Sequence, residues 1–260
     1  MSAAEEIASK DQAARLATAQ HHAVESWLNE CSGAQIESPD IVVQAFLSGG
    51  SSPSGDLEYT VGADATSGWF SRALHFAVCC TYQRAVSSTH KWTQLLCAFQ
   101  LRVAVASDVP ALLSLIKELA EFEKEPDAVK IDEDTLLRDG FPTNTTPLFY
   151  VLVLEDSSGS VVGFALSFVS YSTWTGRNVY LEDLYITPSA RRGGLGTMMI
   201  DTLVMAAAAS GCSRVSWQAL DWNEPAVKCY EKLGAHNEGQ WLNYKLHAED
   251  IKTRMAAALV

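Results

Sequence analysis

From Leu101 onward the chain alternates between two kinds of hydrophobic pattern. Short runs rich in β-forming residues predict strands at 101–106, 148–154, 161–171, 179–186, 215–220 and 241–246. Apolar residues at helical spacing predict helices over 108–122, 131–139, 195–210, 224–233 and 248–258. This order mixes hairpins with strand–helix–strand units and therefore predicts an α/β (α+β-like) domain, in which helices flank a mixed central sheet.

Turn and cap residues separate these segments. Asp108 can cap a helix whose first turn contains Pro110, and Asn223 precedes Glu224-Pro225 in the same way. Ser157-Ser158-Gly159 is typical of a hairpin turn. Gly211 ends a predicted helix as a glycine after the last helical residue does.

The first 99 residues follow no comparable pattern, and we treat them as an N-terminal extension to a domain over 100–260. Residues 1–30 have helical composition, whereas 32–65 are rich in Gly, Ser, Pro and Asp and predict a flexible, partly disordered linker. Residues 66–107 contain no Asp or Glu, yet include aromatic residues and four Lys or Arg. An anionic partner is one interpretation; we favour an extension packed on the domain, because a charge run alone is weak evidence.

Charge and composition narrow the function classes. The formal net charge of −12 argues against a nucleic-acid partner and suits a site that attracts cations. The first residues are acidic and unlike a targeting peptide, and no apolar run reaches transmembrane length, so a cytoplasmic protein without membrane contact is expected. The six cysteines show no zinc-type spacing, and no metal is expected.

The stretch Tyr180–Thr197 is the strongest candidate for a functional site. It combines a strand with adjacent acids at Glu182 and Asp183, a turn rich in Arg and Gly, and the start of a helix. Backbone N–H groups at such a helix start favour an anion such as a pyrophosphate, and the glycines permit close approach. The motif alone is weak, because it lacks the Lys-Ser/Thr of a P-loop and the G-x-G-x-x-G spacing.

Together, the ordered motifs over Leu101–Met255 resemble the GNAT superfamily of acetyl-CoA-dependent N-acetyltransferases, in its diamine (spermidine/spermine) and thialysine acetyltransferase branch. The matching runs are Leu115–Ala120, Val162–Ala165, Tyr171–Trp174, Tyr180–Asp183, Arg191–Gly196, Leu220–Pro225, Tyr230 and Gly234-Ala235. Residues 1–99 have no counterpart in this resemblance.

The resemblance implies direct transfer of acetyl from acetyl-CoA to a primary amine. Glu182 would take the proton that an alkyl ammonium must lose, and Tyr230 would supply a proton to the leaving thiolate. Cys229 is rejected as a nucleophile, because no His occupies a recognisable partner position. The implied cofactor-binding residues are Leu184, Tyr185 and Ile186 along the pantetheine arm, Arg191, Arg192, Gly194, Leu195, Gly196 and Thr197 around the pyrophosphate, and Asn223. Arg192 departs from the commoner glycine.

The expected substrate is the primary amine of a polyamine or diamine of the spermidine/spermine type, and an amino-acid side-chain amine is the alternative. The expected substrate-binding residues are Phe122, Glu123, Trp174, Asp183 and Asp221, whose acids favour a diamine or polyamine. Ser172 replaces an acid of the spermidine/spermine enzymes, and Tyr171–Trp174 resembles the thialysine type, which favours an amino-acid side-chain amine such as thialysine, ornithine or a lysine-like group. A rival of another class is an inactive relative that serves as an interaction module. A homodimer is expected from the resemblance alone.

Overall fold

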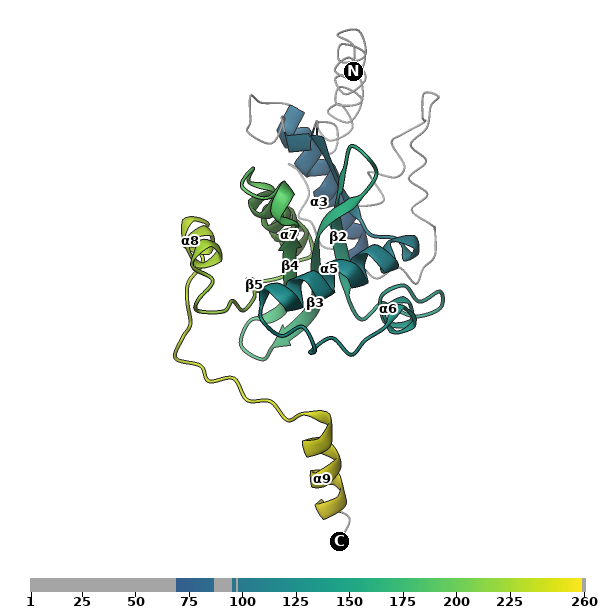
Figure 1. The fold of residues 1–260 in the computed structure, drawn as a ribbon. Helices are drawn as coiled ribbons and strands as arrows, with labels where there is room; N and C mark the ends of the chain where they lie inside the picture. The colour runs from purple at the N-terminus through teal and green to yellow at the C-terminus, as the bar shows by residue number, and fades with distance from the viewer. Residues whose placement is uncertain (1–68, 87–94, 97, 259–260) are drawn as a thin grey trace. The chain divides into compact units, whose positions relative to one another are not determined.

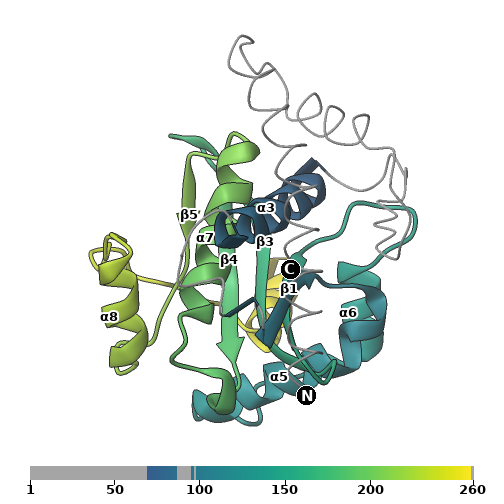
Figure 2. The ribbon, with the colours of Figure 1, turned by 90° about the horizontal axis from the view of Figure 1, so that it is seen from above.

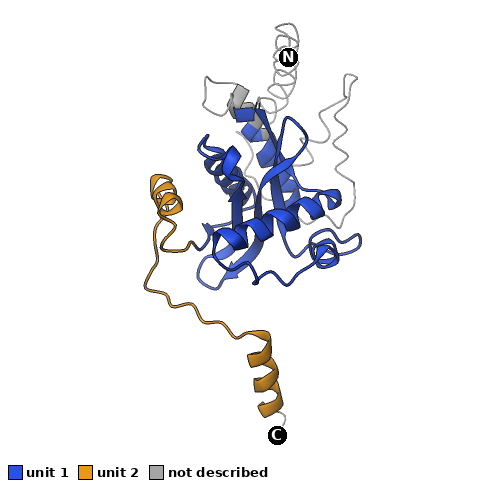
Figure 3. Ribbon diagram, in the orientation of Figure 1, with its two compact units in different colours: residues 1–218 blue, residues 219–260 orange. Residues whose placement is uncertain are grey.

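The computed structural model describes residues 69–86, 95–96 and 98–258. The helix expected over 1–30 and the linker expected over 32–65 lie outside these residues. The chain divides into two compact units, Met1–Gln218 and Ala219–Val260, which are coloured separately in Figure 3. Each unit is described by itself.

The first unit is built on a five-stranded sheet in the order β1-β2-β3-β4-β5. The strands are β1 (Phe99–Val103), β2 (Tyr150–Asp156), β3 (Val161–Ser172), β4 (Gly176–Ile186) and β5 (Arg214–Ser216). The first four pair antiparallel, whereas β5 pairs parallel to β4. This is the mixed sheet that the sequence predicts.

Helices cover both faces of the sheet. On one face lie α5 (Val109–Phe122), which follows the short helix η1 (Ala106–Asp108), and α6 (Glu133–Gly140). On the other face lie α3 (Trp69–Val86) and α7 (Leu195–Ala209), as the two views in Figures 1 and 2 show. A second short helix, η2 (Pro188–Ala190), joins β4 to the turn before α7.

The alternation of side chains along β2 explains this three-layer arrangement. Val151 and Val153 belong to the cluster formed with α5, whereas Tyr150 on the opposite face meets Phe70 of α3, with ring centroids 5.1 Å apart. All five residues from Tyr150 to Leu154 are buried. Because both faces are covered, β2 reads as a continuous apolar run rather than as an alternating strand.

Helix α3 is part of this packing, although it precedes the predicted domain. Phe70 and Leu74 are fully buried, and Thr81 shares a buried hydrogen bond of 2.7 Å with Thr202 of α7 through their Oγ1 atoms. The acid-free segment that contains α3 therefore packs on the domain through buried side chains between Phe70 and Thr81.

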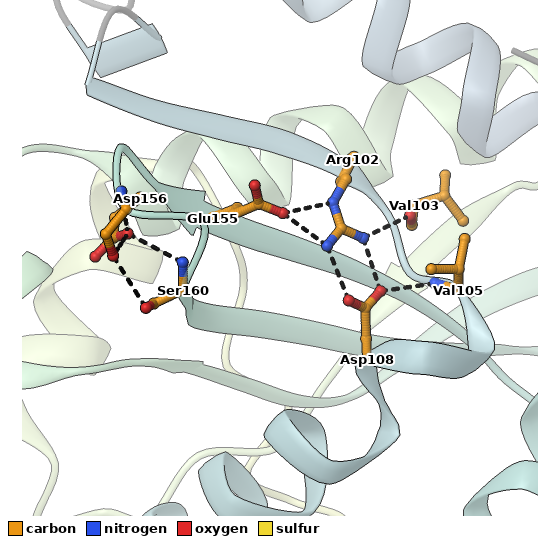
Figure 4. Close-up of polar contacts among 8 residues, drawn as sticks. Arg102, Val103, Val105, Asp108, Glu155, Asp156 and Ser160 are labelled. Atoms are coloured by element: carbon orange, nitrogen blue, oxygen red, sulfur yellow. Dashed lines mark hydrogen bonds and ion pairs between the residues drawn. The ribbon is translucent and has the colours of Figure 1, made fainter. Parts of the chain in front are cut away.

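A charged cluster joins β1, β2 and the start of α5 (Figure 4). Arg102 donates to both carboxylate oxygens of Asp108, at 2.7 and 2.8 Å, and to Glu155 at 3.0 and 2.8 Å. Asp108 also accepts the N–H of Val105 at 2.8 Å. Asp108 is the N-cap residue of α5, as expected. Its carboxylate accepts hydrogen bonds within this cluster and makes no side-chain cap hydrogen bond to the helix.

The second unit corrects one prediction. It contains α8 (Glu224–Lys232) and α9 (Ala248–Ala258), close to the expected bounds, but residues 241–246 form no strand and are exposed. The alternating apolar residues there suit a strand, but a strand also needs a neighbouring strand with which to form hydrogen bonds. In the first unit, β5 is shorter than predicted, because it ends at Ser216 instead of Leu220. Among the described residues, no helix is long and apolar enough to cross a membrane.

Candidate active site

A β-bulge reshapes β4 at the paired acids. Leu166 of β3 pairs with Asp183, and the next residue, Ser167, pairs with Leu181, so that Glu182 is an extra residue in β4. A bulge bends its strand and breaks the alternation of side chains. Asp183 therefore joins Tyr180 and Tyr185 on the face that α5 covers, as the pairing of Tyr180 with Phe168 and of Tyr185 with Phe164 indicates.

Three carboxylates gather around this bulge. Burial, followed by the negative charges of Glu182 and Glu123, raises the pKa of Asp183 from 3.8 to about 6. Burial also raises the pKa of Glu123, which follows the last residue of α5. Glu182 is exposed, whereas Asp183 is half-buried. The structure thus brings together Glu123, Glu182 and Asp183, which the sequence analysis assigned to proton transfer and substrate binding.

The end of α5 is tied to the end of β4 by aromatic and charged side chains. The guanidinium of Arg191 lies 5.2 Å from the ring centroid of Phe122 and 5.1 Å from that of Tyr185. Its Nε donates to the carbonyl of Ile186 at 2.6 Å. Arg191, expected at the pyrophosphate, is therefore directed at Phe122 and β4 in this structure.

Tyr185 contributes a contact that the sequence analysis missed. Its hydroxyl donates to Oε2 of Glu118 at 3.1 Å, which makes a second link between α5 and β4. Glu118 precedes Phe122 by four residues, so the two share one face of α5. That spacing could have drawn attention to Glu118, but its partner on β4 could not be read from the sequence.

One edge of β4 is open over the three expected pantetheine residues. Within the described chain, β5 pairs only with Asn178, Val179 and Tyr180, so β4 from Leu181 to Ile186 is paired on the β3 side alone. An unpaired strand edge presents N–H and C=O groups that an extended molecule can meet. Leu184, Tyr185 and Ile186 all lie on this segment, where the carbonyl of Ile186 accepts from Nε of Arg191.

The turn after β4 has the backbone of an anion site. Arg192 and Gly194 adopt left-handed conformations, with φ of 74° and 95°, and Gly194 is the N-cap of α7 without a side-chain cap. Helical geometry directs the first N–H groups, those of Leu195, Gly196 and Thr197, away from the helix, with the positive end of its dipole behind them. A pyrophosphate fits this donor set.

The remaining residues that were expected in the site are described within the unit to which each belongs. In the second unit, Tyr230 lies on α8, and burial, with a smaller effect of Cys229, raises the pKa of its phenol. Asn223 is the N-cap of α8 without a side-chain cap bond, and Asp221 is exposed. In the first unit, Trp174 lies in the turn between β3 and β4 with 85% of its surface exposed. In the described part of the chain, no three His, Cys, Asp or Glu residues form a group able to hold a metal ion.

Comparisons with known proteins identify the family. Residues 112–235 match the model of the acetyltransferase (GNAT) family. The thialysine N-epsilon-acetyltransferase of Mus musculus is 44% identical over 164 residues, which cover 59% of this chain and 95% of the relative. The spermidine/spermine N(1)-acetyltransferase-like protein 1 of Homo sapiens is 36% identical over 162 residues, which cover 59% of this chain and 23% of that protein.

A solved structure supports the fold alone. The integron cassette protein VCH_CASS6 from the mobile metagenome of V. cholerae superposes with a TM-score of 0.50 at 20% identity, over 61% of this chain and 98% of that one.

The mixed sheet, the match to the acetyltransferase family and the named relatives identify an acyltransferase of the N-acetyltransferase type. The chain belongs to the acetyltransferase (GNAT) family, in its diamine and thialysine acetyltransferase branch, and it is an enzyme that acetylates an amine.

Proposed function

We propose that the protein transfers the acetyl group of acetyl-CoA to a terminal primary amine of a small cationic molecule. The observation that carries this proposal is the cluster of Glu123, Glu182 and Asp183 at the bulge, beside the open edge of β4 and upstream of the turn. Three carboxylates in a partly buried site attract an ammonium group and favour its charged form nearby.

Acetyl-CoA, when bound, supplies an acetyl group activated as a thioester. The free edge of Leu184, Tyr185 and Ile186 would hold its extended arm, with Asn223 bonding the amides of the arm. The N–H groups of Gly194, Leu195, Gly196 and Thr197, with the charge of Arg192, would hold its pyrophosphate. Arg191 keeps α5 and β4 together in this scheme.

The acids at the bulge prepare the amine. An alkyl ammonium with a pKa near 10.4 has to lose a proton before its nitrogen can attack, and a carboxylate can receive that proton directly or through water. Glu182 takes this role in the proposal, while Asp183 and Glu123 hold the cation. Tyr230 is the general acid, and its raised pKa keeps the phenol protonated at neutral pH.

Between the two amine classes, we propose an amino-acid side-chain amine of the thialysine or lysine type as the preferred substrate. Ser172 stands where the spermidine/spermine enzymes carry an acid, and its Oγ accepts the N–H groups of Trp174 and Thr175 at 3.1 and 3.3 Å. It therefore ends the strand and adds no negative charge for a long polycation. The relative named for thialysine also has a higher identity than the one named for spermidine and spermine.

A diamine or polyamine is the second candidate, because three neighbouring carboxylates suit a molecule with several ammonium groups. Release of coenzyme A thiol, measured with thialysine, lysine, ornithine, putrescine and spermidine, separates the classes. The proposal predicts the highest kcat/KM for thialysine or lysine. A higher value for spermidine or putrescine would reverse this order.

A further inference from the structure

Leu95, just before β1, lies against the turn that is proposed to bind the pyrophosphate. A Cβ atom placed on Gly193 would lie 2.8 Å from Cδ2 of Leu95, and one placed on Gly194 would lie 3.9 Å from Cδ1. These distances put the leucine methyl groups directly on the backbone of the turn. A side chain at position 193 would have to push Leu95 away.

The sheet explains how this contact arises. Phe99 at the start of β1 pairs with Asp156 at the end of β2, and Gly163 near the start of β3 pairs with Ile186 at the end of β4. The start of β1 and the end of β4 therefore lie at the same end of the sheet. Leu95 precedes Phe99 by four residues, and the turn follows Ile186 after η2.

The turn is a segment that benefits from an external support. Arg192 and Gly194 have positive φ angles on either side of Gly193, and glycine loses more conformational freedom on ordering than any other residue. Its N–H groups can bind an anion tightly only if they are already directed at one point. The half-buried side chain of Leu95 restricts the turn on the side of Gly193.

We propose that Leu95 is a positioning residue that holds the Gly193-Gly194 turn in the shape that binds the pyrophosphate of acetyl-CoA. This inference rests on the proposed function. It assigns a part in cofactor binding to the chain before β1, which lies outside the segment matched by the family model. Leu95 itself touches no phosphate in this scheme and acts through the backbone of Gly193.

A double-mutant cycle with L95A and G193A tests the contact and its effect together. Gly193 does not have a positive φ, so Ala is compatible with its backbone and interferes mainly through Leu95. L95A is expected to raise the Kd for acetyl-CoA roughly three- to tenfold. G193A is expected to weaken acetyl-CoA binding in the wild-type background and clearly less in the L95A background.

Two further readouts separate positioning from a general loss of structure. The KM for the amine and kcat at saturating acetyl-CoA are expected to stay within about twofold of the wild-type values, since the acids at the bulge are untouched. L95M, which keeps a long apolar side chain, is expected to retain most of the affinity. L96A is the matched control at the neighbouring position, and its Kd for acetyl-CoA is expected to match that of the wild type.

The outcomes are distinct. An unchanged or tighter Kd in L95A, or strictly additive effects of L95A and G193A, would overturn the role of Leu95 while leaving the proposed function intact. If the wild-type protein itself bound no acetyl-CoA, the proposed function would fail, and the role of Leu95 with it.

Discussion

At the scale of single residues, the surroundings of Asp183 disfavour the ionised form of its carboxyl group. Its half-buried position and the neighbouring charges of Glu182 and Glu123 raise its pKa to about 6. In the unfolded chain the pKa is near 3.8. The folded state therefore binds the proton more tightly than the unfolded state, and ionising Asp183 destabilises the fold. Such opposition is common where a site is shaped for a cationic ligand.

Replacing Asp183 with Asn is predicted to stabilise the unliganded protein at pH 7 by about 1–2 kcal/mol. Below about pH 4 the carboxyl is protonated in both states, so the gain is absent there; it grows as pH rises from about 4 to about 6 and is complete above that. Urea unfolding of D183N and wild type between pH 4 and 8 measures this difference. A gain independent of pH, or a loss at pH 7, would contradict the assignment of the charge cluster.

Arg192 has an unfavourable backbone conformation. Its φ of 74° is one that residues with a Cβ atom adopt at an energetic cost, and glycine avoids that cost. Arg192 was expected to replace a commoner glycine, and the left-handed backbone supplies the physical reason why glycine suits this position.

R192G is predicted to raise the free energy of unfolding by roughly 0.5–1 kcal/mol, the relief of strain minus the greater freedom of glycine in the unfolded chain. It should also weaken acetyl-CoA binding by a few fold, with less dependence on salt, because a cation near the pyrophosphate is lost. R192A is the control: it removes the same charge but keeps the strain. Equal stability of R192G and R192A would refute the strain argument.

At the scale of elements, the cluster around Arg102 holds β1 and β2 to the start of α5. Burial alone would raise the pKa of Asp108, but hydrogen bonds from Arg102 and the N–H of Val105 outweigh it and lower that pKa. This part of the stabilisation is present above the ordinary pKa of 3.8 and is lost as pH falls through the lowered value.

R102M is predicted to lower the free energy of unfolding by about 2–3 kcal/mol at pH 7, because two partly buried carboxylates lose their partner. The control is R138M, which breaks the exposed pair with Asp139 and should change stability by no more than about 0.5 kcal/mol. Urea unfolding of both variants compares the two sites. Similar losses in the free energy of unfolding for R102M and R138M would contradict the claim that burial makes the Arg102 cluster more stabilising than an exposed ion pair.

The elements also show what sequence could and could not predict. Strands β1 to β4 and helices α5 to α7 follow from hydrophobic spacing, because each has buried residues, whereas α8 and α9 have none and were predicted from cap residues and helical composition. The bulge at Glu182 could not be predicted, since it depends on the register between β3 and β4 rather than on β4 alone. The wrong strand at 241–246 has the same origin: composition favours extension, but pairing requires a neighbour.

At the scale of the whole molecule, the first unit brings together segments that are far apart in the sequence. Its sheet brings Glu123 to Asp183 and Leu95 to Gly193. The proposed roles of Tyr230 and Asn223 fall on residues of the second unit. Family resemblance assigned roles to most of these residues. The roles of Leu95 and Glu118 required the three-dimensional contacts, because no local pattern marks a residue that acts by supporting another.

The protein is proposed to transfer acetyl from acetyl-CoA to a small amine, with Glu182 as the base and Tyr230 as the acid. The most direct test is a single assay of coenzyme A thiol release with thialysine and spermidine, for the wild type, E182Q and Y230F. Amine-dependent release is expected for the wild type, with kcat roughly 100-fold lower in each variant. No release with any amine, or wild-type rates in both variants, would contradict it.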